Sequence, residues 1–188
     1  MILAIDIGNT NTVIGCCRDD EILFVERLST DSSRTVVEYA ISIKNVLELY
    51  QIRPDDLKGS IISSVVPPLT NLFREAISKI IGKEPMVVGP GVKTGLNILM
   101  DNPGQVGSDL IVNAVAALAE HPVPLIIIDL GTATTISVVD SKKNYIGGMI
   151  LPGIRVSLDS LVNRTSQLHR ISLEAPKRLI GKNTGECM

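Results

Sequence analysis

The stretch that decides the fold is ILAIDIGNTNTVIG, residues 2–15. Its apolar run at residues 2–7 stops at Gly8, a pattern typical of a buried strand. Two more strands are expected at residues 12–18 and 22–28, with a turn at Asp19-Asp20 between them. The chain therefore begins with a three-stranded meander, whose first turn is Asp6-Ile7-Gly8-Asn9-Thr10.

Beyond the meander, strands and helices alternate. Apolar residues at helical or strand spacing predict helix 36–49, strand 60–66, helix 68–81 and strand 85–88. The pattern then restarts with helix 109–120, strands 125–129, 134–140 and 145–150, and helix 153–163. Residues 164–183 look irregular, and Thr184 is placed to cap one more helix. The fold class is α/β.

The second half of the sequence repeats the pattern with which the first half begins. Asp129-Leu130-Gly131-Thr132-Ala133-Thr134-Thr135 follows an apolar run as Asp6-Ile7-Gly8 does, and Asp129 lies 123 residues after Asp6. This indicates a duplicated fold with domains at 1–90 and 104–188. The second copy lacks the later strand–helix pairs of the first, which would leave an apolar face and sheet edges uncovered. We therefore expect a longer natural chain that is cut within its second domain.

Composition excludes several classes of protein. The 188 residues carry a net charge of -2 with no basic run, which argues against nucleic-acid binding through a charged face. Cys16, Cys17 and Cys187 lack the spacing of a metal site and are expected to be free thiols. No signal peptide and no apolar stretch of about 20 residues is present, so a cytoplasmic protein without membrane contact is expected.

The two Asp-x-Gly turns are candidates for binding phosphate. Gly8 lets the backbone approach a bulky anion, and backbone N–H groups in such a turn form an anion-binding nest. Asp6 is suited to Mg²⁺, which prefers one or two carboxylates plus phosphate oxygens. An ordinary hairpin turn has the same composition and explains a single copy equally well. Two such turns facing each other across a cleft favour a polyphosphate clamp.

Two other motifs have competing explanations. In Val106-Gly107-Ser108-Asp109, Asp109 begins a helix, where N-capping is the leading interpretation and a general base for a substrate hydroxyl the functional one. The glycines of Gly147-Gly148 indicate either close approach of a nucleotide or packing of the meander.

Taken in order, these motifs resemble type III pantothenate kinase across essentially the whole chain. The set comprises Asp6-x-Gly8-Asn9-Thr10, Arg34-Thr35, residues 62–67, Gly107-Ser108-Asp109, Asp129-x-Gly131-Thr132, Gly147-Gly148-x-Ile150-x-Pro152-Gly153 and Gly181-Lys182-Asn183-Thr184. The resemblance implies two ribonuclease H-like domains of the acetate and sugar kinase, heat-shock chaperone and actin superfamily. It implies ATP-dependent phosphorylation of pantothenate to 4'-phosphopantothenate, the first step of coenzyme A synthesis, by a homodimer.

The resemblance also implies a role for each site residue. ATP with Mg²⁺ would be bound by Asp6, Ile7, Gly8, Asn9, Thr10, Asn11, Thr12, Val13 and Thr132, with Asp6 on Mg²⁺ through phosphate. Asp129 would bind a monovalent cation, K⁺ or NH₄⁺, and Asp109 would be the proton acceptor. Pantothenate would contact Met100, Gly107, Ser108, Asp109, Leu110 and Thr184.

The chain departs from the family pattern at two of these positions. Leu110 stands where the family often has Arg, and Met100 where it often has Tyr. An Arg would offer a charged fork to the carboxylate of pantothenate, and Leu110 cannot. Because family members also run past Gly181-Lys182-Asn183-Thr184, the sequence leaves open whether this length of chain is active.

Three alternatives to a pantothenate kinase remain. A kinase-like transcriptional regulator would be favoured by loss of Asp109 or of both turns, and all are present. A sugar or acetate kinase tends to carry a second Gly where this chain has Asn9. An actin-like assembly protein is not distinguished by any residue pattern.

Overall fold

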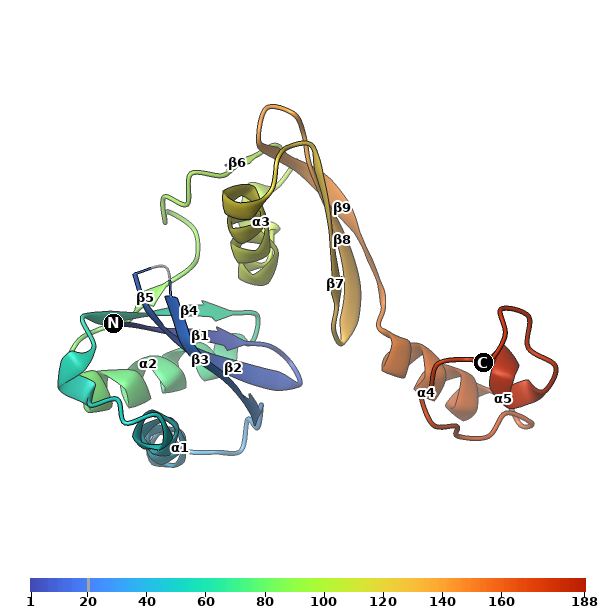
Figure 1. Ribbon diagram of the computed structural model, residues 1–188, viewed down its shortest axis with the longest axis horizontal. Helices are drawn as coiled ribbons and strands as arrows, with labels where there is room; N and C mark the ends of the chain where they lie inside the picture. The colour runs from blue at the N-terminus through green and yellow to red at the C-terminus, as the bar shows by residue number, and fades with distance from the viewer. Residues whose placement is uncertain (20) are drawn as a thin grey trace.

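The first sheet of the protein has the strand order β3-β2-β1-β4-β5 in the computed structural model, which describes residues 1–19 and 21–188 (Figure 1). Its strands are β1 (Ile2–Ile7), β2 (Asn11–Arg18), β3 (Glu21–Ser29), β4 (Gly59–Ser64) and β5 (Met86–Val87). The expected meander is confirmed, since β1, β2 and β3 pair antiparallel and β4 joins parallel to β1. Of the turn expected at Asp19-Asp20, Asp20 lies outside the described residues.

Two helices provide the core of this half, α1 (Val36–Leu49) and α2 (Pro67–Ile81). Thr35 and Glu38 form a capping box at the start of α1, and Gly82 ends α2 in the left-handed conformation with φ 70°. The rings of Tyr39 and Phe73 pack with their centroids 4.3 Å apart and join the helices to each other. This large core fixes the first sheet in place.

The second sheet has the order β6-β9-β8-β7 and a much smaller core. Its elements are β6 (Asn97–Ile98), η2 (Pro103–Gln105), α3 (Ser108–Glu120), β7 (Leu125–Leu130), β8 (Ala133–Val139) and β9 (Asn144–Pro152). The bounds of β7 and β9 lie 123 residues after those of β1 and β3. Both meanders also have a register shift in the middle strand, at Cys16/Cys17 and at Val138/Val139. The two short elements β6 and η2 (like η1, Pro54–Asp56, in the first half) were not expected from sequence.

The last part of the chain contains α4 (Ile154–Arg164) and α5 (Thr184–Cys187), and Figure 1 shows both on one side of the body, away from α3. The expected irregular stretch before α5 is confirmed. The expected cap is wrong by one residue, because the side chain of Asn183 accepts the bond from Glu186 N–H and Thr184 is the first residue of the helix.

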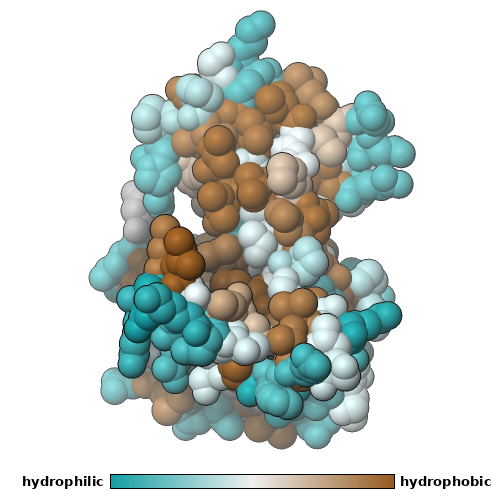
Figure 2. Space-filling view, turned by 90° about the vertical axis from the view of Figure 1, so that its right-hand side faces the viewer, coloured by the Kyte–Doolittle hydropathy of each residue, from teal (hydrophilic) through white to brown (hydrophobic). Residues whose placement is uncertain are grey.

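One face of the second sheet is apolar and open to solvent. Figure 2 shows apolar surface gathered over the upper half of the molecule, where Figure 1 has β7, β8 and β9. By the strand register, Leu130 and Met149 lie on the same face, where they are 68% and 57% exposed, and β7 is an edge strand. Within the described residues, none of the helices combines the length and apolar character needed to cross a bilayer.

Candidate active site

The two Asp-x-Gly turns meet in space although Asp129 lies 123 residues after Asp6 in the chain. Thr10 Oγ1 lies 2.7 Å from Thr132 Oγ1, within hydrogen-bond distance. Each turn is closed by a glycine N–H: Gly8 donates to the carbonyl of Asn11, three residues on, and Gly131 donates to that of Ala133, two residues on. A Cβ at Gly8 would lie 3.0 Å from the Asn11 carbonyl oxygen, which leaves little room for any other residue. Both turns are therefore tight and aimed at a common space.

That space is a cleft of about 830 Å³ between the two halves of the chain. It lies where β1 and β7 end at their carboxyl ends, the edge at which open α/β sheets bind ligands. The residues predicted for ATP, acid–base chemistry or cations that line it are Asp6, Gly8, Asn9, Thr10, Asn11, Val13, Asp109, Asp129 and Thr132. Most of the predicted site is thus brought to one cavity from three separate segments, residues 6–13, Asp109 and residues 129–132.

Two of the predicted ATP residues do not line the cleft. Ile7 is fully buried in the first core. Thr12 is fully buried as well, and its Oγ1 lies 3.0 Å from Thr30 Oγ1. Thr30 in turn donates to the carbonyl of Gly8 at 2.7 Å, so this pair of threonines supports the first turn from behind.

Three carboxylates share the cleft. Burial raises the pKa of Asp6 above its ordinary value, a hydrogen bond with Ser63 opposes this, and the charges of Asp109 and Asp129 raise it further. The Asp129 carboxylate accepts a hydrogen bond from Asn113 Nδ2 at 3.0 Å. Concentrated negative charge of this kind suits a site that binds cations along with an anionic ligand.

Asp109 is the second residue of α3, and Gly107 is the N-cap. The N-capping interpretation of Asp109 is therefore wrong. Its carboxylate instead accepts a hydrogen bond from Leu110 N–H at 2.8 Å, close to the positive end of the helix. A Cβ at Gly107 would collide with Asp109 Oδ1, so the glycine leaves room for the carboxylate to face the cleft.

Ser108 is buried and lines neither the cleft nor the second cavity described below. Its Oγ accepts from Ser64 N–H at 3.0 Å and donates to the Ser64 carbonyl at 2.9 Å. Ser64 is the last residue of β4 and pairs with Ile7 at the end of β1. Ser108 therefore fixes the start of α3 to the first sheet, and with it the position of Asp109 near Asp6.

Ser108→Ala is expected to lower the free energy of unfolding by about 1–3 kcal/mol, because Ser64 N–H loses its partner. Chemical denaturation followed by circular dichroism measures this. The matched control is Ser42→Ala, since Ser42 donates to a carbonyl one turn back on the exposed face of α1. Equal stability of the two variants would contradict the role given to Ser108.

A second cavity of about 410 Å³ lies between the loop before α3 and the strands β8 and β9. It brings together Met100 and Leu110, two of the residues predicted for pantothenate. Thr135 lines both this cavity and the cleft, so the two spaces adjoin. Thr184 lines neither of them, because it lies on α5.

The cleft also contains two arginines that sequence reasoning missed, Arg27 and Arg155. Arg27 pairs with Val13 across β2 and β3, and Arg155 follows Gly153 in the first turn of α4. The register of the meander was a usable signal for Arg27, because Val13 had been assigned to the ATP turn. Both side chains are cations available to a polyphosphate.

The glycines at 147 and 148 have a packing role. Gly147 has φ +138°, and the chain bulges there because Val138 pairs with Gly147 while Val139 pairs with Tyr145. A Cβ at Gly148 would collide with the carbonyl of Ile136 on β8. Of the two explanations left open by the sequence, packing of the meander is the one with contacts to support it.

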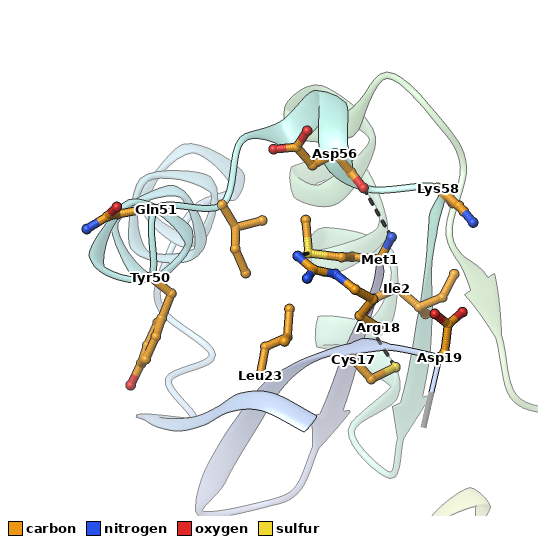
Figure 3. A pocket seen from close by; sticks show the side chains of 11 residues that line it. Met1, Ile2, Cys17, Arg18, Asp19, Leu23, Tyr50, Gln51, Asp56 and Lys58 are labelled. Atoms are coloured by element: carbon orange, nitrogen blue, oxygen red, sulfur yellow. Dashed lines mark hydrogen bonds between the residues drawn. The ribbon is translucent and has the colours of Figure 1, made fainter. Parts of the chain in front are cut away.

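A third cavity lies away from all these residues, at the amino end of β1 (Figure 3). It measures about 880 Å³ and is lined in part by Arg18, Leu23 and Tyr50. The Met1 amino group donates to the Asp56 carbonyl at 3.1 Å along its upper wall. It contains no residue of the predicted site and lies at the sheet end opposite the two turns.

Turns of this kind bind polyphosphate through backbone N–H groups, and a carboxylate beside them can take the proton of a substrate hydroxyl. These features define an enzyme of the kinase class, which transfers a phosphoryl group from ATP to an acceptor.

Comparison with known proteins identifies the family. The sequence pattern of type III pantothenate kinase matches residues 2–188. The chain is 45% identical over 188 residues to a type III pantothenate kinase of Halalkalibacterium halodurans and 45% identical to one of an Exiguobacterium species. Each match spans 100% of this chain and 74% of the relative. The chain belongs to the type III pantothenate kinase family, which phosphorylates pantothenate in coenzyme A biosynthesis.

Solved structures support the fold alone. A Campylobacter jejuni protein described as a candidate Baf family transcriptional activator has a TM-score of 0.55 and 19% identity, over 98% of this chain and 70% of that one. A Sinorhizobium meliloti protein described as a candidate 2-dehydro-3-deoxygalactonokinase has a TM-score of 0.50 and 12% identity, over 88% of this chain and 57% of that one. Both agree with a mixed α/β protein that has two sheets.

Proposed function

We propose that the two turns bind the phosphates of ATP and that Asp109 accepts the proton of the pantothenate hydroxyl. The cavity of about 410 Å³ would then bind the rest of the pantothenate molecule. The observation that carries this is the contact of Thr10 with Thr132, because it joins two phosphate-type turns over one cleft. Residues 6–13, which comprise the first turn and the start of β2, would supply backbone N–H groups, and Thr132 a hydroxyl. Arg27 and Arg155 add positive charge along the same walls.

Two cations fit the charge of the cleft. No three His, Cys, Asp or Glu side chains of the described residues are grouped closely enough to hold a metal ion together. Mg²⁺ does not need such a group, since it uses one or two carboxylates with phosphate oxygens and water. We assign Mg²⁺ to Asp6, whose pKa is raised by burial and by the charges of Asp109 and Asp129, and a monovalent cation, K⁺ or NH₄⁺, to Asp129. Positive charge at either place would relieve the repulsion among the three carboxylates.

The position of Asp109 indicates where pantothenate would bind. Asp109 lines the cleft and the next residue, Leu110, lines the adjoining cavity. A substrate whose hydroxyl reaches Asp109 would therefore extend past Leu110 toward Met100. In this arrangement Gly107 and Ser108 act by positioning α3. Contact of Thr184 with pantothenate stays a prediction.

Two features of the whole molecule belong to the same proposal. The common offset of 123 residues between the meanders supports two ribonuclease H-like domains related by duplication, at 1–90 and 104–188. Homodimer formation is supported by the exposed apolar face that contains Leu130 and Met149, because large apolar patches commonly mark protein interfaces. A cytoplasmic location stays a prediction.

The proposal is tested by measuring ADP release from ATP with and without pantothenate. We expect release to depend on pantothenate, on Mg²⁺ and on K⁺ or NH₄⁺, with 4'-phosphopantothenate found by mass spectrometry. A panel of sugars and acetate provides the negative controls. Release that is equally fast without pantothenate, or with a sugar in its place, would contradict the assignment of the second cavity.

A further inference from the structure

The charge of its lining distinguishes the cavity assigned to pantothenate from the cleft. Among the residues that the structure describes, neither Lys, Arg nor His lines it, and its one ionisable acid is Asp101. The remaining lining side chains are apolar or neutral, and Met149 and Ile150 of β9 are among the most exposed of them. Two hydroxyls of the lining, Ser137 and Tyr145, lie 3.1 Å apart and bond each other.

Pantothenate has two chemically different ends, a primary hydroxyl that receives the phosphoryl group and a carboxylate. With the hydroxyl at Asp109, the carboxylate end falls within this cavity. A carboxylate that leaves water without a charged partner loses much of its hydration energy, and Asp101 would add repulsion. A neutral group at the same place loses much less. None of the described lining side chains therefore favours the charged form over a neutral one.

We propose that this protein also phosphorylates neutral analogues of pantothenate, in which an alcohol or an amide replaces the carboxylate, and that Leu110 is the residue that admits them. The inference rests on the proposed function of the cavity. The reaction is unchanged: the substrate hydroxyl oxygen forms a bond to the γ-phosphorus of ATP, the bond from that phosphorus to the β–γ bridging oxygen breaks, ADP leaves, and Asp109 takes the hydroxyl proton.

Leu110 has this role because of its place on α3. It is half-buried in the first helical turn, directly after Asp109, and its side chain forms part of the cavity wall. A cationic side chain at this position would lie next to the bound substrate and would stabilise its carboxylate through a charge-assisted hydrogen bond. Leucine provides apolar contact instead, which an alcohol or amide uses as well as a carboxylate does.

The test is the ratio of kcat/KM for pantothenate to kcat/KM for pantothenol, the corresponding alcohol, in the purified protein. We expect a ratio below about ten, since a site built around a charged partner discriminates by orders of magnitude against a substrate that lacks it. A ratio above about ten would overturn the inference. Phosphorylation of neither compound would instead overturn the proposed function, and the inference with it.

Two gain-of-charge variants test the role of Leu110. Leu110→Arg is expected to raise the ratio about tenfold or more, and Ile150→Lys, on the β9 wall of the cavity and 74% exposed, is expected to raise it in the same direction. The matched control Ala119→Arg adds the same charge to an exposed position of α3 outside the cavity and should leave the ratio unchanged. An unchanged ratio in both folded gain-of-charge variants would overturn the assignment.

Discussion

Asp109→Asn is expected to lower kcat by about 10²- to 10⁴-fold, the range over which a positioned general base accelerates a reaction. The substitution keeps the size and shape of the side chain and the oxygen that accepts from Leu110 N–H. It removes the ability to take the hydroxyl proton as the phosphoryl group transfers. KM for ATP should change little, because the phosphate-binding turns are separate segments that meet through Thr10 and Thr132. Steady-state rates with varied ATP and pantothenate measure both parameters.

The control for this variant is Glu120→Gln, which removes an exposed carboxylate at the other end of α3. It carries the same loss of charge on the same helix and should leave kcat within about twofold, as surface substitutions usually do. If Asp109→Asn kept nearly the rate of the unmodified protein while its thermal stability fell, the carboxylate would be a structural element of the helix start, and the assignment of the base would fail.

The turns and their supporting strands could be predicted from sequence because the signals are local. An apolar run followed by Asp6-Ile7-Gly8 fixes a strand end and a tight turn within a few residues, and the same pattern recurs at Asp129. That the two turns lie close together was a weaker inference, because it rested only on the assumption that repeated motifs face one cleft. The bond between Thr10 and Thr132 now provides that contact.

What the sequence did not reveal depends on contacts between distant segments. The resemblance implied that Ser108 contacts pantothenate, yet α3 turns it toward Ser64 on β4. The resemblance likewise implied that Thr12 contacts ATP, yet the pleat of β2 directs it into the core toward Thr30. One residue of displacement reverses the direction of a side chain in a strand, so membership of a motif does not establish which face a residue occupies.

Gly153 connects the second turn to the start of α4. It is the N-cap of this helix, and its N–H donates to the carbonyl of Thr132 at 3.0 Å. A Cβ at this position would collide with the carbonyl oxygens of Gly131 and Thr132 and would lie 2.8 Å from the Thr132 carbonyl carbon. These are backbone atoms, which cannot move aside as the end of a flexible side chain can. Even the smallest side chain must therefore displace the turn.

Gly153→Ala is accordingly expected to raise KM for ATP by about tenfold or more, because a shift of about 1 Å in a positioning group can cost up to 10²-fold. Thermal stability should fall as well, since overpacking usually costs about 1–3 kcal/mol. Gly89→Ala is the matched control, because a Cβ at Gly89 meets no atom within 4 Å. Titrating ATP into both variants while following the melting temperature separates the two effects, since the stabilisation by a ligand depends on its affinity for the folded state. If Gly153→Ala melted earlier yet gained as much stability from ATP as Gly89→Ala, the second turn would serve packing only, and the phosphates would have to be held by residues 6–13 alone.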